Sequence, residues 1–346
     1  MIYSDAAHPS WCAAFKRVFE LCKIQPNETV VVLSETGSRT INVELARLAL
    51  TEMSLPFTDV TVASPPAPAG PIIRSTGASE ALNAAPDNVI AQLCGADMVI
   101  DLTIEGLMHA PQTPRILQAG ARIMNISNEH PDILARLVPT PEIKDRVREA
   151  AQRCRAASEM TVRSEAGTDL TIAMGGAATV GVWGYTDRPG TLAHWPAGLV
   201  VSFPKAGAVN GRIVFQPGDI NLTFKRYFER AVSCTITEDF LSDIQGDGAD
   251  ARLMQAYLEG FADPLAFSTS HVGWGLNPAA RYEALTMYDK HELNGTELRA
   301  LAGNFLFSTG ANEFADRFTR GHFDLPMMGC DIALDGVAVV QGGVPV

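Results

Sequence analysis

Apolar and polar residues follow two different patterns along the first 155 residues. Some stretches repeat apolar residues on one helical face, and others are short, almost wholly apolar runs, as in strands buried on both faces. Helices are predicted over residues 9–24, 42–53, 85–93 and 115–119. Strands are predicted over residues 29–33, 57–62, 98–102 and 122–126. This βαβ order predicts an open, mostly parallel α/β sheet with helices on both faces.

The pattern changes after a long amphipathic stretch, residues 142–160, which predicts a helix linking two halves. Short strand-like segments then alternate with glycine turns, and one predicted helix, 249–259, interrupts them. These strands are predicted over 160–163, 169–173, 199–203, 211–215, 220–224 and 231–237. We therefore expect an α/β domain over residues 1–155 and a β-rich α+β domain over residues 156–346.

Composition limits the possible functions. The 346 residues are 47% hydrophobic, which supports sizeable cores, and the net charge of −12 argues against nucleic-acid binding, which needs basic patches. The chain has no run of 18 apolar residues and no signal-peptide pattern, so we expect a cytoplasmic protein without membrane contact. The six cysteines are scattered, with no CxxC pair, and are expected to be reduced thiols.

The first candidate chemistry lies in the segment 321–327. Gly321 and Pro326 are expected to bound a short strand that contains His322 and Asp324. Residues i and i+2 of a strand point to the same face, so this imidazole and this carboxylate can approach a single metal ion. Phe323 would then point the opposite way, into the core.

A third ligand is predicted at His271, in the segment 268–278. Small polar residues precede this histidine, and two glycines and an Asn-Pro pair follow it, so the backbone there is constrained. Two histidines and one carboxylate are typical of non-haem Fe(II) oxygenases, but they also suit a hydrolytic zinc site. The residues alone leave a third possibility, in which His271 and His322 are hydrogen-bonded core side chains.

Two further histidines are candidates for acid–base work. His109 lies in a loop after the predicted strand 98–102, where ligands bind in open α/β sheets, and His194 precedes a predicted strand of the second domain. A histidine near its ordinary pKa of about 6.5 suits proton transfer at neutral pH, although a structural role is equally open for each. The remaining histidines, His8, His130 and His291, are predicted at the surface.

The segments 270–278 and 321–327 resemble those of the 2,5-dihydroxypyridine 5,6-dioxygenase family, and the resemblance extends along the whole chain. This family is a distant relation of thermophilic aminopeptidases, so the resemblance implies an aminopeptidase-T-like fold. It implies a mononuclear Fe(II) site at His271, His322 and Asp324. It also implies cleavage of 2,5-dihydroxypyridine by O2 to N-formylmaleamate, in nicotinate degradation, by an enzyme expected to be a homo-oligomer.

By position, the resemblance assigns acid and base roles to His109 and His194, without deciding which is which. It places substrate-binding residues at Met108, where the family has leucine, and at Ser308. The alternative is an aminopeptidase-like hydrolase with one or two metal ions. The segment 203–207 lacks the glutamate that such enzymes use as a ligand, and this loss favours one metal ion and the oxygenase.

Overall fold

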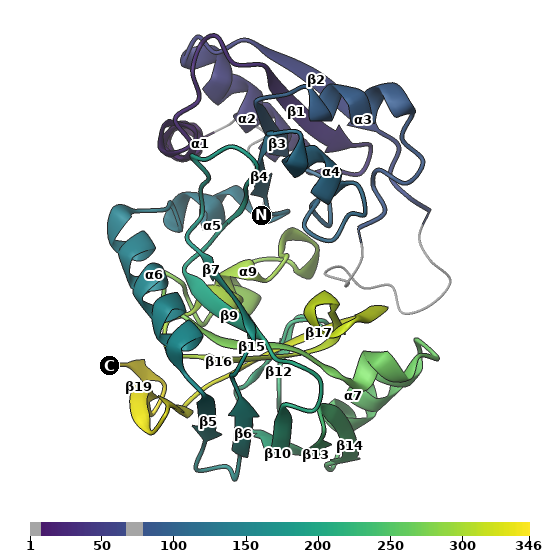
Figure 1. Cartoon of the computed structure of the whole chain (residues 1–346), viewed down its shortest axis with the longest axis vertical. Coiled ribbons are helices and arrows are strands. Elements are labelled where there is room, and N and C mark those ends of the chain that lie inside the picture. Colours follow the sequence, from purple (N-terminus) through teal and green to yellow (C-terminus); the bar gives the residue numbers. More distant parts are fainter. Residues whose placement is uncertain (1–7, 67–78) are drawn as a thin grey trace.

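A five-stranded parallel sheet forms the N-terminal part of the computed structural model, which describes residues 8–66 and 79–346 (Figure 1). Its strand order is β2-β1-β3-β4-β8, and all four pairings are parallel. The strands are β1 (Val30–Glu35), β2 (Phe57–Val62), β3 (Met98–Asp101), β4 (Arg122–Ile126) and β8 (Leu192–Trp195). The helices are α1 (Pro9–Leu21), α2 (Thr40–Glu52), α3 (Asp87–Cys94), α4 (Thr113–Gln118) and α5 (Pro131–Arg136). The prediction of an α/β sheet is confirmed.

Helices cover both faces of this sheet because successive strand residues point to opposite sides. In β1, Val30 and Val32 pack with residues of α1 and α2, whereas Val31 and Leu33 pack with residues of α3 and α4. Strands β1, β3 and β4 are buried along their whole length, which explains their almost continuous apolar sequences. The edge strand β2 is mostly exposed at its start.

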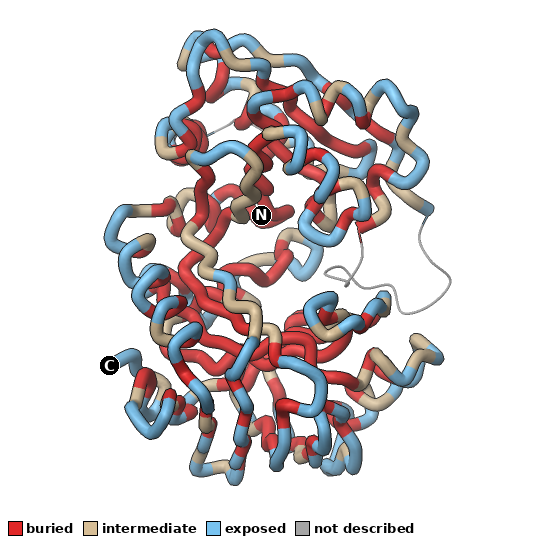
Figure 2. The backbone as a smooth tube through the Cα atoms, in the orientation of Figure 1, coloured by how far each residue is buried: buried red, intermediate tan, exposed pale blue. Residues whose placement is uncertain are grey.

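Two antiparallel sheets form most of the C-terminal part and pack face to face (Figures 1 and 2). The larger sheet has the order β14-β13-β10-β6-β5-β18-β19-β20, and the smaller has the order β17-β16-β15-β9-β7. The larger sheet comprises β5 (Glu159–Arg163), β6 (Asp169–Ala173), β10 (Val209–Phe215), β13 (Val232–Thr237), β14 (Phe240–Gln245), β18 (Asp331–Leu334), β19 (Val337–Gln341) and β20 (Val344–Pro345). The smaller comprises β7 (Ala178–Val182), β9 (Leu199–Phe203), β15 (Thr269–Gly275), β16 (Phe305–Asn312) and β17 (Arg317–Met327).

Apolar side chains from both sheets form one continuous core, to which Ile172, Val200 and Phe307 belong. Helix α6 (Pro141–Ala156) packs on β7 and β9, and both α6 and α7 (Ala249–Glu259) contribute apolar side chains to this core. The remaining elements are the small pair β11 (Ile220–Asn221) and β12 (Arg226–Tyr227) with the short helices α8 (Ala284–Met287), α9 (Thr296–Ala300), η1 (Pro264–Phe267), η2 (Lys290–Glu292) and η3 (Glu313–Ala315).

Some local predictions were wrong. The predicted strand 220–224 ends at Asn221, because the Asn221 side chain accepts the Phe224 N–H and turns the chain. Strand β17 extends over Arg317–Met327, so neither Gly321 nor Pro326 bounds it. Proline is tolerated there because β17 is an edge strand of its sheet, where one row of backbone N–H groups has no strand to pair with.

Other predictions have clear outcomes. All six cysteines are free, as expected. None of the described helices is long and apolar enough to span a bilayer. His8 and His291 are exposed as predicted, but His130 is buried, because its ring accepts the Asp132 N–H at the start of α5 and lies 4.8 Å from the Tyr288 ring.

Candidate metal centre and active site

Strand alternation places the three predicted ligands on one face of the smaller sheet. In β15, Val272 and Trp274 point into the core, so His271 points out of the opposite face. In β17, Phe323 and Leu325 belong to the same core, so His322 and Asp324 share the outer face. The prediction for Phe323 is therefore confirmed.

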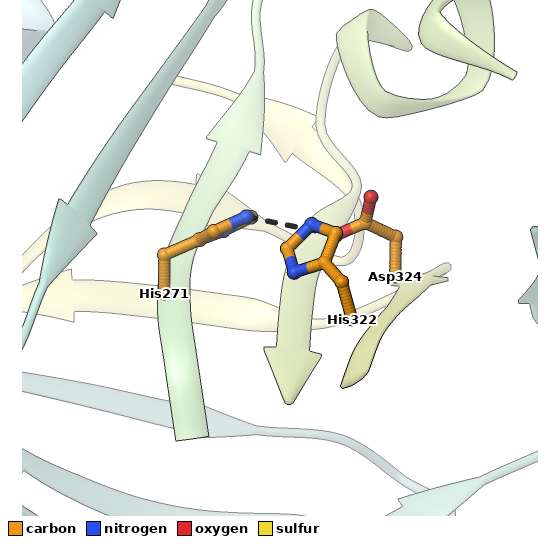
Figure 3. Close-up of side chains that lie close together, drawn as sticks. All are labelled: His271, His322 and Asp324. Carbon is orange, nitrogen blue, oxygen red and sulfur yellow. Dashed lines mark ion pairs between the residues drawn. The ribbon is translucent and has the colours of Figure 1, made fainter. Parts of the chain in front are cut away.

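The three side chains converge on one point from two strands (Figure 3). Asp324 Oδ1 lies 3.3 Å from His322 Nε2 and 3.6 Å from His271 Nε2. All three ligand atoms lie within 4.8 Å of one another. No other group of three or more potential metal-binding residues occurs in the part of the chain that the structure describes. The shared face of His322 and Asp324, which their spacing predicted, is therefore present, and His271 lies beside them.

Gly273 explains why the sequence around His271 is rich in glycine. A Cβ at this position would lie 1.9 Å from the Val200 carbonyl oxygen on the neighbouring strand β9. No side chain can be accommodated at that distance without moving the backbone. The glycine thus lets β9 and β15 approach closely and fixes His271 relative to the sheet.

Asp324 is held by two side chains besides the histidines. The Ser308 hydroxyl on β16 donates to Oδ1, and Arg299 Nε on α9 donates to Oδ2 at 2.5 Å. Burial opposes ionisation of this carboxyl group, but Arg299 and His322 outweigh it and hold its pKa well below the usual range. Asp324 is therefore an anion whose Oδ2 is occupied and whose Oδ1 faces the histidines.

The His271 ligand is electrically neutral. Burial lowers the pKa of His271 to about 3, so its ring is uncharged at neutral pH and can offer a lone pair. Within the described residues, neither His271 Nδ1 nor His322 Nδ1 has a hydrogen-bond partner, although both atoms are buried. Among the residues that the structure describes, no hydrogen-bond acceptor therefore fixes the orientation of either ring through Nδ1.

A small cavity of about 150 Å³ opens beside the three ligands, between the parallel sheet and the smaller antiparallel sheet. Its apolar wall comes largely from β9, with contributions from the neighbouring strands and from the loop after β3. The apolar lining residues are Met108, Val182, Leu199, Val201, Phe203 and Leu306. A cavity of this size admits only small ligands.

His109 and His194 reach the cavity from the parallel sheet and its loops. The His109 ring lies 6.3 Å from the His322 ring, measured between centroids. Asp101 fixes the loop that leads to it, by accepting the Thr103 N–H at 3.0 Å and the Leu107 N–H at 2.7 Å. His194 precedes β9, a strand of the smaller antiparallel sheet, as its sequence predicted, but it lies in β8, which belongs to the first sheet.

The expectation of ordinary histidine pKa values was wrong. Burial lowers the pKa of His194 to about 4. Burial, with a smaller contribution from His322, also lowers the pKa of His109 to about 4. His109 keeps exposed surface because it opens onto the cavity, but protein encloses it closely enough to disfavour the charged form. Both rings are therefore neutral at pH 7.

The two residues expected to bind substrate lie in different settings. Met108 lines the cavity and is 43% exposed, so it can contact a ligand. Ser308 is fully buried behind Asp324, its hydroxyl bonded to that carboxylate.

The chain was compared with known proteins, and the family model described as "NicX: 2,5-dihydroxypyridine 5,6-dioxygenase" matches residues 10–346. A 2,5-dihydroxypyridine 5,6-dioxygenase of Pseudomonas putida is 34% identical over 335 residues, which cover 95% of this chain and 94% of that protein. The chain belongs to this dioxygenase family.

Solved structures agree with this family assignment. The structure of the 2,5-dihydroxypyridine dioxygenase from Pseudomonas putida KT2440 is similar with a TM-score of 0.91 at 33% identity, covering 97% of this chain and 96% of that one. AmpT from Thermus thermophilus is similar with a TM-score of 0.60 at 12% identity, covering 97% and 99%. The second similarity establishes a shared fold, so the predicted aminopeptidase-T-like architecture is confirmed.

Sequence reasoning missed several polar residues of this dioxygenase cavity. Glu105 comes from the loop before His109, and Asn294, Thr296 and Arg299 come from α9 and the residues before it. Arg299 is the most consequential, because it contacts a predicted metal ligand directly. No periodic pattern marks it, since α9 is only five residues long and its place depends on contacts distant in sequence.

Proposed function

We propose that this chain is an Fe(II)-dependent, extradiol-type dioxygenase that opens 2,5-dihydroxypyridine with O2 between C5 and C6, giving N-formylmaleamate. The observation that carries the proposal is the convergence of two imidazoles and an ionised carboxylate beside a small, mostly apolar cavity. Family membership supports the substrate and the reaction type.

The donor set fits a ferrous ion. Nitrogen and oxygen ligands about 2.1 Å from a metal, at right angles to each other, lie about 3 Å apart. The 3.3 Å and 3.6 Å separations at Asp324 Oδ1 come close to this value, so shifts of a few tenths of an ångström suffice. When bound at this triad, Fe(II) would leave open positions for a substrate oxygen and for O2 and allow electron transfer from the ring to O2.

His194 is proposed as the base. A carbonyl oxygen can only accept a hydrogen bond, so the 3.1 Å contact with the Pro196 oxygen requires the proton on His194 Nδ1. In the neutral ring, Nε2 then carries the lone pair that can take a hydroxyl proton from the substrate. His109 reaches the same cavity from the loop after β3 and is proposed as the acid, which returns to the substrate the proton that the base has removed from it.

The cavity walls are proposed to orient the ring. Apolar contacts from Leu199, Val201 and Phe203 would hold a flat aromatic molecule and exclude water, and Met108 would contact it from the other side. A direct substrate contact for Ser308 remains a prediction. Its buried hydroxyl supports a role through Asp324, whose Oδ1 it holds toward the histidines.

A hydrolase is less well supported, although AmpT shares the fold. A two-metal hydrolytic site needs additional carboxylates to bridge and balance two cations. Among the described residues, only His271, His322 and Asp324 form a metal-binding group. A role in nicotinate degradation, a homo-oligomeric state and a cytoplasmic location are further parts of the proposal. So is a domain boundary near residue 155, which β8 crosses by pairing with β4 of the first sheet.

The decisive experiment is anaerobic loading of the metal-free protein with Fe(II), followed by oxygen uptake with 2,5-dihydroxypyridine. We expect one O2 consumed per substrate, appearance of N-formylmaleamate, and no uptake with Zn(II) in place of iron. Peptide hydrolysis by the zinc-loaded protein, with no oxygen uptake by the iron-loaded protein, would favour the hydrolase.

A further inference from the structure

Glu129 is a fully buried carboxylate that lies in the loop between β4 and α5. It is part of the N-terminal half of the chain, yet all three of its carboxylate hydrogen bonds cross to residues 294–296. Its Oε2 accepts the Asn294 N–H at 2.8 Å, and its Oε1 accepts those of Gly295 at 2.8 Å and Thr296 at 2.7 Å. One side chain thus fixes three consecutive backbone groups.

Those backbone groups begin helix α9, whose first N–H groups have no partner within the helix. An anionic acceptor satisfies them with short, charge-assisted hydrogen bonds, which are stronger than neutral ones. The same turn is held by the Ser127 hydroxyl, 3.1 Å from that of Thr296. Gly295 has a φ of 101°, a conformation that glycine adopts readily, so the backbone can form this turn without strain.

Helix α9 places Arg299 beside the metal centre. The Arg299 Nε bonds Asp324 Oδ2 at 2.5 Å, and its Nη1 donates to the Asn294 side-chain oxygen at 3.1 Å. A continuous path of short contacts therefore runs from Glu129 through residues 294–296 and Arg299 to Asp324. Each step is a hydrogen bond to a buried or half-buried partner.

We propose that Glu129 is a positioning residue for the metal centre, which acts through α9 and Arg299 on the orientation of Asp324. This inference rests on the proposed metal-dependent function but concerns how the site is held together. It makes metal affinity depend on the packing of the N-terminal part against α9, although that part supplies none of the three predicted ligands.

The test compares Fe(II) affinity in the full-length Glu129→Gln variant and the unchanged protein, by anaerobic titration against a chromogenic chelator. The substituted amide must turn an N–H₂ group toward a backbone N–H, so at least one of the three hydrogen bonds is lost. We expect the dissociation constant for Fe(II) to rise about 10-fold to 100-fold, the range for groups that orient metal ligands.

Asp250→Asn is the matched control. Asp250 is also a buried carboxylate, 2% exposed, and it accepts the Glu229 and Arg230 N–H groups at 2.9 and 3.0 Å, away from the cavity. It should lower the melting temperature of the metal-free protein while leaving Fe(II) affinity within about threefold of the unchanged protein. An equal loss of Fe(II) affinity in both variants would show a general effect of destabilisation and overturn the proposal.

A double-variant cycle tests the path. In an Arg299→Met background, Glu129→Gln should weaken Fe(II) binding by less than about threefold, because residue 299 then has no N–H group to donate to Asp324. An undiminished effect there, or an unchanged affinity in Glu129→Gln alone, would contradict the proposal.

If Glu129→Gln does not fold, Ser127→Ala loosens the same turn without changing a buried carboxylate and should raise the dissociation constant for Fe(II) severalfold. Fe(II) binding that follows this pattern without any oxygen uptake would refute the proposed function and leave this inference standing.

Discussion

Replacing Arg299 with methionine should destabilise the metal-free protein markedly. The substitution keeps a long apolar stem but removes the guanidinium that bonds Asp324 at 2.5 Å. The Arg299 side chain is 13% exposed and that of Asp324 only 2%, so water can replace little of the lost interaction. The variant therefore leaves a buried carboxylate without its strongest partner.

The magnitude follows from the geometry of the pair. The charge centres of a hydrogen-bonded guanidinium and carboxylate are about 4 Å apart, and at an effective dielectric constant of 20 they attract by about 4 kcal/mol. The hydrogen bond from Ser308 remains and offsets part of the loss. We expect a decrease of about 3 kcal/mol in the free energy of unfolding, at the lower end of the range for breaking a buried ion pair.

The assay is urea unfolding at pH 7.5 with a chelator present, followed by far-ultraviolet circular dichroism. Arg320→Met is the control, because Arg320 pairs with Glu80 at 3.4 Å with side chains 53% and 37% exposed, and its loss should cost less than 1 kcal/mol. The double variant Arg299→Met with Asp324→Asn should recover part of the stability. A decrease below 1 kcal/mol for Arg299→Met would refute the electrostatic reasoning.

Three further predictions concern other parts of the site. Asp324→Ala should abolish Fe(II) binding, and an iron content equal to that of the unchanged protein would contradict the ligand assignment. The folded-state pKa of His194, about 4, lies below its unfolded value near 6.5, so protons favour the unfolded state as pH falls through this window. His194→Gln should accordingly remove up to about 2 kcal/mol of the stability lost between pH 7.5 and pH 5, and an unchanged pH dependence of the urea midpoint would contradict this. Gly273→Ala should yield little folded protein, because the new Cβ would lie 1.9 Å from the Val200 oxygen, whereas Gly175→Ala, with open space around its Cβ, should fold.

The pattern of apolar residues within single strands was enough to predict the buried strands of the parallel sheet and the pairing of two site residues. The apolar runs of β1, β3 and β4 are buried on both faces, so their sequences report their position directly. The two-residue period of a strand was enough to place His322 and Asp324 together, because the core side of β17 is marked by Phe323.

Other features of the site depend on contacts between residues that are far apart in the sequence, and these could not be predicted. Arg299 matters because Glu129, 170 positions earlier in the sequence (299 − 129), fixes the turn that begins its helix. The low pKa of His194 arises from burial at the meeting of two sheets, which no local pattern encodes. Pro326 was misread because edge and central strands are indistinguishable until the strand order is known.

The placement of β8 has a consequence for how this protein can be divided. The chain leaves the small antiparallel sheet after β7, adds β8 to the edge of the parallel sheet, and returns as β9. A fragment ending at α6 would leave the edge of β4 unpaired, and an unpaired edge promotes aggregation. A fragment starting at β5 would contain β8 without β4, the strand with which it pairs. The two fragments made by a protease that cuts between α6 and β5 should therefore remain associated. Gene recombination at that point would not produce a domain that folds on its own.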